Sequence, residues 1–200
     1  GYLLWHRPGR KVFIDGRVAA SAGAQLQDYL AVAEAKPGFG HVLNGRKVEL
    51  IIAPHHLLRP AAGAPFQPIA HDPVWALVYF DDVALIYQRR DQRQAARLRR
   101  VAYRALAPGD DRAPFRAGVP RELAISEARR ALATTPSVRA ATYLGVLLMA
   151  KGDFAGAEAA LNQARVLAPD SLPVLNNLGV LASRRGDKVA ARRLFQRVLE

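Results

Sequence analysis

The first residues with notable chemistry are a carboxylate and a guanidinium at the end of an apolar run. Asp15 and Arg17 flank Gly16, directly after the run at 11–14. Open α/β sheets bind ligands at the carboxyl ends of their strands, so this pair could hold a sugar or a phosphate. The alternative is an ion pair that supports a tight turn. No glycine-rich phosphate loop accompanies Gly16, which argues against a nucleotide site.

A metal site is the second chemistry to consider, because the chain contains adjacent histidines and adjacent aspartates. Neighbouring side chains on a strand point to opposite faces, and no carboxylate stands at ligand spacing beside His55 and His56. Asp81 and Asp82 fall in an expected hairpin turn, where aspartate is favoured because it bonds the backbone. We therefore predict no metal, no cofactor and no catalytic residue. The other histidines are His6, His41 and His71.

A third group is basic. The segment from Arg89 to Leu106 is predicted to be a connecting helix, and at 100° per residue four arginines fall on one stripe of it. The stripe suits anionic lipid headgroups or a phosphorylated ligand, and its alternative is the solvated face of a packed linker helix. Nucleic acid is disfavoured, because interleaved aromatic residues and a binding motif are missing. The four residues are Arg93, Arg97, Arg100 and Arg104.

Composition limits the elements that can position these residues. The 200 residues suit one or two domains, and half of them are hydrophobic, so a core can form. The net charge of +12 indicates either an anionic partner or biased composition. The absence of cysteine excludes disulfides and thiolate chemistry, and no apolar run reaches the roughly 18 residues that a membrane helix needs. Because the chain opens without Met and ends inside an expected helix, we expect a fragment of a longer protein.

The clearest pattern in the sequence is an internal repeat with an offset of 34 residues. Gly145, Gly152, Asp153, Ala157 and Leu161 recur as Gly179, Gly186, Asp187, Ala191 and Phe195. An offset of this length is typical of stacked helix-turn-helix units, which bury their apolar faces against their neighbours. The turns at 151–153 and 185–187 combine a glycine for the left-handed conformation with an aspartate that caps the next helix.

These positions resemble the tetratricopeptide repeat, in which a glycine lets the first helix approach its neighbour closely. Residues 137–170 and 171–200 each resemble one unit, and residues 120–136 resemble the second helix of a preceding unit. About three repeats are needed for independent stability. We therefore expect the array to lean on the preceding segment or to continue beyond Glu200.

The resemblance implies a concave groove, lined by the first helix of each unit, that binds a peptide. Asn177 stands where many such repeats carry an asparagine that bonds a peptide backbone or a terminal carboxylate. The alternative is that Asn-Leu-Gly is simply common in these helices. By position, the implied groove residues are Arg139, Thr142, Tyr143, Val146, Met149, Asn176, Asn177, Val180 and Arg184.

The first half of the chain predicts a small α/β domain. The runs 11–15 and 49–53 are expected strands with a helix at 26–33 between them, and this order suggests a right-handed parallel crossover. The runs 75–80 and 83–87 predict a hairpin, and a short helix is expected around Ile69. The predicted fold class is thus α/β plus all-α. It consists of a mixed-sheet domain with a βαβ unit and a β-hairpin at 1–88, a basic connecting helix and linker at 89–118, and the helical array at 119–200.

This half is also similar, over about the first hundred residues, to the soluble tail of certain bacterial polytopic membrane proteins. They are of the glycosyltransferase and oligosaccharyltransferase kind. The resemblance implies an extracytoplasmic location and a tether of membrane helices outside this fragment, where the catalytic acidic residues also lie. Positive charge favours the alternative of a cytoplasmic location, although large translocated domains escape the charge rule. The residues that carry the similarity are 2–5, 10–17, Asp28-Tyr29-Leu30, Ile52-Ala53-Pro54 and the hairpin from Trp75 to Arg90.

Together these patterns predict a non-catalytic scaffold that binds a protein or peptide partner, as part of a larger bacterial membrane protein. One alternative is an accessory domain of a membrane glycosyltransferase that acts on lipid-linked sugars, with contacts to anionic lipid or glycan. The other is a basic cytoplasmic adaptor that binds nucleic acid, prompted by the charge alone.

Overall fold

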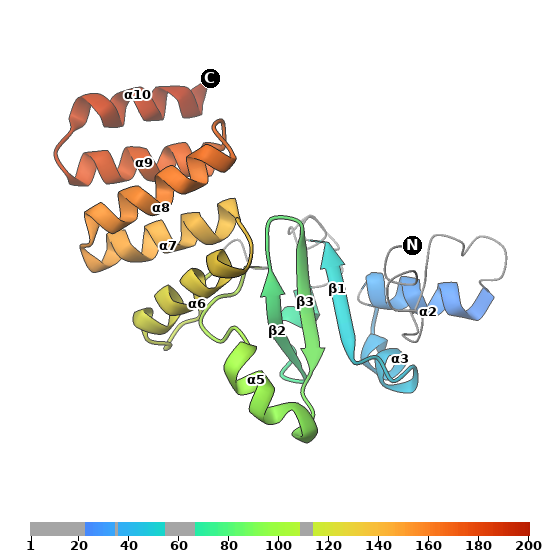
Figure 1. Ribbon diagram of the computed structural model, residues 1–200. Coiled ribbons are helices and arrows are strands. Elements are labelled where there is room, and N and C mark those ends of the chain that lie inside the picture. The colour runs from blue at the N-terminus through green and yellow to red at the C-terminus, as the bar shows by residue number, and fades with distance from the viewer. Residues whose placement is uncertain (1–22, 35, 55–66, 109–113) are drawn as a thin grey trace.

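The computed structural model describes residues 23–34, 36–54, 67–108 and 114–200, and it places a small sheet with short helices beside a stack of longer helices (Figure 1). This arrangement confirms the predicted fold class, an α/β part followed by an all-α array. The first part contains α2 (Gly23–Ala33), α3 (Phe39–Gly45), β1 (Leu50–Pro54), α4 (Gln67–His71), β2 (Trp75–Phe80) and β3 (Ala84–Arg89). The second contains η3 (Gln92–Gln94), α5 (Ala95–Val101), α6 (Arg121–Thr134), α7 (Val138–Lys151), α8 (Phe154–Leu167), α9 (Leu172–Arg184) and α10 (Lys188–Leu199).

The described sheet has three antiparallel strands in the order β1-β3-β2. β2 and β3 form the predicted hairpin. Its turn is held by Asp81, whose Oδ1 accepts hydrogen bonds from the backbone N–H groups of Val83 and Ala84, both at 2.7 Å. β1 pairs with the other edge of β3, with Ile51 opposite Tyr87. Exposed and buried residues alternate along β1, as expected for a strand with one face on the core.

The predicted parallel crossover falls only partly within the described residues. The expected helix at 26–33 is present as α2, and the strand expected at 49–53 is β1. The short helix expected around Ile69 is α4. The strand expected at 11–15 lies outside the described residues, so its pairing stays a prediction. Among the described strands both pairings are antiparallel, because β1 and β2 each run against the central β3.

The connecting helix is shorter than predicted, and this is a correction. In place of one helix from Arg89 to Leu106, the chain forms η3 and the seven-residue α5, which ends at Val101. The backbone N–H groups that would continue the helix bind elsewhere. Tyr103 N donates to Leu77 O in β2 at 2.8 Å, and the next three N–H groups donate to a side chain of α6. Tertiary hydrogen bonds therefore end the helix before Arg104.

The helices of the array pack in pairs, α7 with α8 and α9 with α10, and α6 packs against α7 (Figure 1). The turns within the pairs are those predicted. Gly152 and Gly186 have φ angles of 87° and 85°, which favour glycine. The aspartates that follow them, Asp153 and Asp187, cap the next helix by accepting backbone hydrogen bonds of 2.8 and 2.9 Å.

Each pair also depends on the close approach that the sequence predicts at its repeated glycine. A methyl group on Gly145 would lie 2.6 Å from Cγ of Leu161 on α8. A methyl group on Gly179 would lie 2.6 Å from Cε1 of Phe195 on α10. Both distances are far below van der Waals contact, so the helices of each pair pack at a spacing that only glycine permits without rearrangement.

The sheet and the array share one hydrophobic core. Phe80 of β2 and Leu85 of β3 belong to the same buried cluster as Leu144 of α7 and Leu161 of α8. Within the described residues, the helix that precedes α6 in the chain is the seven-residue α5, and the sheet lies beside α6 and α7 (Figure 1). The array therefore packs against the preceding segment. This is one of the two outcomes expected from the sequence, the other being further repeats beyond Glu200.

Candidate functional site

The groove implied by the sequence runs over the first helices of the two units, and these two helices differ in exposure. On α9, Asn176 and Arg184 are exposed and Val180 is half-buried. On α7, Tyr143 is 8% exposed and Met149 is 5% exposed. The difference divides the predicted site into a covered part on α7 and an open part on α9.

The covered part is closed by aromatic side chains from outside the array. The ring of Phe115 meets Tyr143 edge-on with 5.4 Å between centroids, and the ring of Phe80 lies 6.4 Å away. Such aromatic pairs contribute roughly 0.5–1.5 kcal/mol each beyond the area they bury. Tyr143 and Met149 thus pack in the core of this structure. Their role in a peptide groove stays a prediction from the sequence.

The remaining predicted residues of α7 are half-buried and make contacts within the helix. Thr142 Oγ1 donates to Val138 O at 2.7 Å, which is one turn earlier on the same helix. Arg139 Nη1 donates to the hydroxyl of Tyr143 at 3.4 Å. Together with Val146, which is also half-buried, these side chains border the covered part.

The open part is the α9 face, which we define as Asn176, Asn177, Val180 and Arg184. Asn176, Val180 and Arg184 follow each other at four-residue spacing and lie on one side of the helix. Asn177 Nδ2 donates to Pro173 O of its own helix at 2.8 Å, which engages one of its two amide hydrogens. The α9 face thus offers amides, a guanidinium and an aliphatic side chain within reach of an extended peptide.

The hairpin turn supplies a cap for α7 that the sequence does not reveal. Asp82 accepts hydrogen bonds from the backbone N–H groups of Val138 at 2.7 Å and Arg139 at 2.9 Å, and from the Ser137 hydroxyl at 2.9 Å. A carboxylate is favoured there, because it binds unpaired N–H groups at the positive end of the helix dipole. The prediction of a turn at Asp81-Asp82 is confirmed, and the second aspartate also fixes the sheet to the array.

A clamp on α6, defined as Glu127 and Arg130, holds the segment 100–106 that connects the sheet to the array, which we call the connector. The Glu127 carboxylate is 3% exposed and accepts from the backbone N–H groups of Arg104, Ala105 and Leu106 at 2.7–3.0 Å. Arg130 Nη1 donates to Arg100 O at 2.7 Å. The sequence does contain a signal for this clamp, because Glu127 interrupts a stripe of alanines that faces the core.

The clamp also explains the environment of Tyr103. The guanidinium of Arg130 lies 4.3 Å from the centre of the Tyr103 ring, in cation–π geometry. Burial raises the pKa of Tyr103, and the neighbouring Arg130 opposes this shift. The buried phenol thus stays neutral at physiological pH and serves the packing of the joint.

The four arginines of the predicted basic stripe do not share a helical face. Arg93 is on η3 and Arg97 on α5, where Arg97 Nη1 donates to Gln88 Oε1 at 2.9 Å. Arg100 is at the end of α5 and Arg104 lies beyond it. The backbone of Arg100 and Arg104 is bound to α6, so these two residues anchor the connector.

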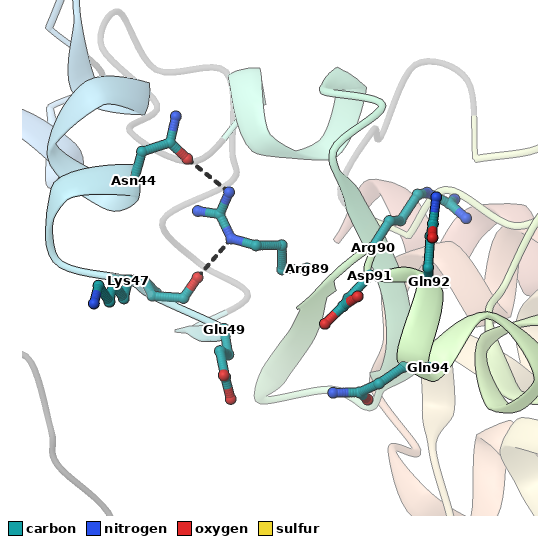
Figure 2. A pocket seen from close by; sticks show the side chains of 9 residues that line it. Asn44, Lys47, Glu49, Arg89, Arg90, Asp91, Gln92 and Gln94 are labelled. Atoms are coloured by element: carbon teal, nitrogen blue, oxygen red, sulfur yellow. Dashed lines mark hydrogen bonds between the residues drawn. The ribbon is translucent and has the colours of Figure 1, made fainter.

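A cleft of about 520 Å³ opens where α3 leads into β1 and where β3 leads into η3 (Figure 2). Arg89 is fixed in its wall. Its Nε donates to Val48 O at 2.7 Å, its Nη1 donates to Asn44 Oδ1 at 2.6 Å, and its guanidinium lies 4.7 Å from the centre of the Trp75 ring. The rest of the lining mixes both charges with amides, so we assign no ligand class. It consists of Lys47, Glu49, Arg90, Asp91, Gln92 and Gln94.

The other candidates from the sequence do not form a site among the described residues. His41 and His71 are exposed, and no group of three or more metal-binding side chains occurs in the described part of the chain. Asp15, Arg17, His6, His55 and His56 lie outside it. No helix within the described ranges is long and apolar enough to cross a membrane.

Comparison with known families supports the repeat assignment. The model of the tetratricopeptide repeat family matches residues 121–172 and 144–200, which together span α6 to α10. The array therefore matches the tetratricopeptide repeat, a class that generally binds proteins and is generally non-catalytic. No curated protein and no solved structure matches the chain. The similarity to the tails of membrane glycosyltransferases stays a prediction from the sequence.

Proposed function

We propose that this chain is a protein-binding module in which the α9 face receives an extended peptide of a partner protein. The observation that carries the proposal is the contrast in exposure between the two first helices. The predicted groove residues of α7 are buried or half-buried, whereas Asn176 and Arg184 on α9 are exposed. The binding surface is therefore confined to the second unit.

The chemistry of the α9 face suits a peptide backbone. A side-chain amide can donate to a carbonyl and accept from an N–H, so Asn176 and Asn177 can bond both groups of a peptide unit. Arg184 adds a cation that can bond a carboxylate with two parallel hydrogen bonds. Val180 between them contributes a small apolar contact.

The test is a selection of displayed peptides on the whole chain, followed by measurement of the selected peptides against variants. N176A/R184A is expected to weaken binding roughly tenfold, because two polar partners at the centre of the contact are lost. The matched control is Q163A/R165A, two exposed residues of α8 on another face, which is expected to bind like the original chain. Unchanged binding of the N176A/R184A variant would remove the α9 face as the site.

The finer proposal locates this module on the extracytoplasmic side of a bacterial membrane, tethered by helices of its parent protein. Support comes from the sequence similarity at 2–5, 10–17 and 75–90. The reading frame upstream of Gly1 tests it directly, since several membrane helices with acidic loops are expected there. A plain start codon close to Gly1 would exclude the tether and favour the cytoplasmic alternative, whereas the peptide-binding proposal would be unaffected.

A further inference from the structure

The outward face of α10 differs from the matched face of α8, although the two helices occupy equivalent places in their units. Each face is formed by five residues at the spacing i, i+3, i+4, i+7 and i+10, so the five side chains lie along one side of the helix. On α8 the residues are Ala155, Glu158, Ala159, Asn162 and Arg165. On α10, 34 positions later, they are Val189, Arg192, Arg193, Gln196 and Leu199, which we call the α10 face.

The repeat itself does not require the residues of the α10 face. On α8 the same positions carry two alanines, and the single acidic residue Glu158 balances the single basic residue Arg165. The α10 face has two arginines and no acidic residue, and Val189 is 64% exposed. Like charges on one side of a helix repel each other, and an exposed valine contributes nothing to folding. α8 thus serves as an internal control for what this helix needs in order to fold.

The surroundings of the α10 face are basic as well. Residues 184–199 contain six basic residues and one acidic residue, whereas the matched residues 150–165 contain two of each. Arg185 pairs with Glu158, and Arg197 pairs with Asp170 at 2.8 Å. Within the described residues, Lys188, Arg192 and Arg193 have no such acidic partner. The excess positive charge is therefore concentrated on the exposed side of α10, at the end of the stack in Figure 1.

We propose that the α10 face binds an acidic amphipathic helix of a partner protein. From Val189 to Leu199 the face extends about 15 Å along the helix axis, or roughly three turns, which is the length over which two helices can pack. Carboxylates of the partner pair with Arg192 and Arg193 in two-pronged geometry. Leucine-type side chains of the partner cover Val189 and Leu199. This surface is separate from the α9 face and does not depend on peptide binding there.

Two other anionic partners fit the α10 face less well. Insertion into a membrane surface needs the apolar side of the helix, but Ala191 and Phe195 on that side pack against α9. Single-stranded nucleic acid needs exposed aromatic side chains for stacking, and Phe195, the aromatic residue of α10, lies against Gly179. A second copy of the chain would bring the same positive charge to the contact.

The experiment uses the whole chain and a fluorescent synthetic helix of about 18 residues, or five turns, with one leucine stripe flanked by glutamates. R192E/R193E is expected to weaken binding of this acidic helix at least tenfold, because two attractive contacts become repulsive. V189S is expected to weaken it several-fold through lost apolar contact. The matched control R129E/R165E makes the same change of charge at exposed residues of α6 and α8 and is expected to change binding less than about twofold, since distant surface charges are screened.

Several outcomes would overturn the proposal. Equal losses of acidic-helix binding in R192E/R193E and in the control would show that the net charge of the protein, not the α10 face, attracts the helix. Binding of a helix with lysine in place of glutamate would also contradict the proposal. Equally tight binding of single-stranded DNA or phosphatidylserine vesicles, sensitive to the same arginines, would assign the face to nucleic acid or membrane. The variant K188A/R192A/R193A removes the positive charges without adding negative ones, and it is also expected to lose binding of the acidic helix. Circular dichroism checks that this variant is folded. N176A alone must bind the acidic helix normally, which separates this proposal from the peptide site on α9.

Discussion

The two repeat units are related by an offset of 34 residues and have the same turns, yet their first helices have opposite surroundings. Tyr143 of α7 is 8% exposed beneath Phe115 and Phe80, whereas Asn177 at the matched position of α9 is only half-buried. Met149 of α7 is buried, and its counterpart Ser183 is exposed. The residue types follow the surroundings: large apolar or aromatic side chains where the sheet covers the helix, and small polar ones where it does not.

This difference shows that the same repeat can pack its first helix against another part of the chain or leave that helix open to solvent. The first helix of the first unit is covered, because Asp82 of the hairpin turn caps α7 and the rings of Phe80 and Phe115 pack against Tyr143. The second unit keeps its first-helix face open. Variants of the joint and of matched positions in the two units can therefore test this difference.

The largest effect is expected at Glu127, which ties α6, the neighbour of the covered helix α7, to the connecting segment at 104–106. E127A leaves three backbone N–H groups without their acceptor, two of them in buried hydrogen bonds, and is expected to lower the free energy of unfolding by about 3 kcal/mol or more. Urea denaturation measures the loss, and E122A on the exposed side of the same helix is the control. A loss equal to that of the control would mean that the clamp does not hold the joint.

Alkaline pH is expected to weaken the sheet that covers α7. Burial raises the pKa of Tyr87 to about 12, against 10.0 for the free side chain. Because the folded pKa lies above the unfolded one, the neutral phenol contributes its stability fully below pH 10, and this is lost as the pH rises to 12. The loss relative to Y87F is expected to approach about 2–3 kcal/mol. Urea denaturation of both proteins at pH 8 and at pH 11 measures the part of this loss that is reached by pH 11, about 1.4 kcal/mol. Parallel pH profiles would contradict the assignment.

The matched glycines test how tightly each pair packs. G145A places a methyl group 2.6 Å from Cγ of Leu161, which is fully buried and cannot move aside, so a net loss of about 1–2 kcal/mol is expected. G179A meets the half-buried ring of Phe195, which has room to shift, so its loss is expected to be smaller. Thermal unfolding of the two variants gives the ranking. The reverse ranking would mean that the open unit is the more rigid one.

The smallest effect is expected at the serines that precede the two first helices. Ser137 is buried, accepts from Ala140 N and donates to Asp82, whereas the side chain of Ser171 makes no capping bond to α9. S137A is expected to cost about 1 kcal/mol and S171A close to nothing. Equal losses in urea denaturation would show that the Asp82 contact does not distinguish the two units.

Much of this comparison could be predicted from residue types and spacing, but the joint could not. The glycine-aspartate turns and the close approach at Gly145 follow from local geometry, and the structure confirms them. The connecting helix was predicted too long, because nothing local shows that Glu127 binds the backbone of 104–106. The burial of Tyr143 could not be predicted for the same reason, since its cover comes from Phe80 and Phe115, 63 and 28 residues away in the chain.

The sequence by itself determined the repeat, its turns, its helix pairs and the hairpin, because each depends on contacts between residues close in the chain. The contrast between the neutral outward face of α8 and the basic face of α10 is also written in the sequence once the offset of 34 is known. Only the tertiary structure decided which first helix is covered. That outcome depends on where the sheet packs, and this position is set by contacts of Asp82, Phe115 and the buried Glu127 with segments distant in the chain.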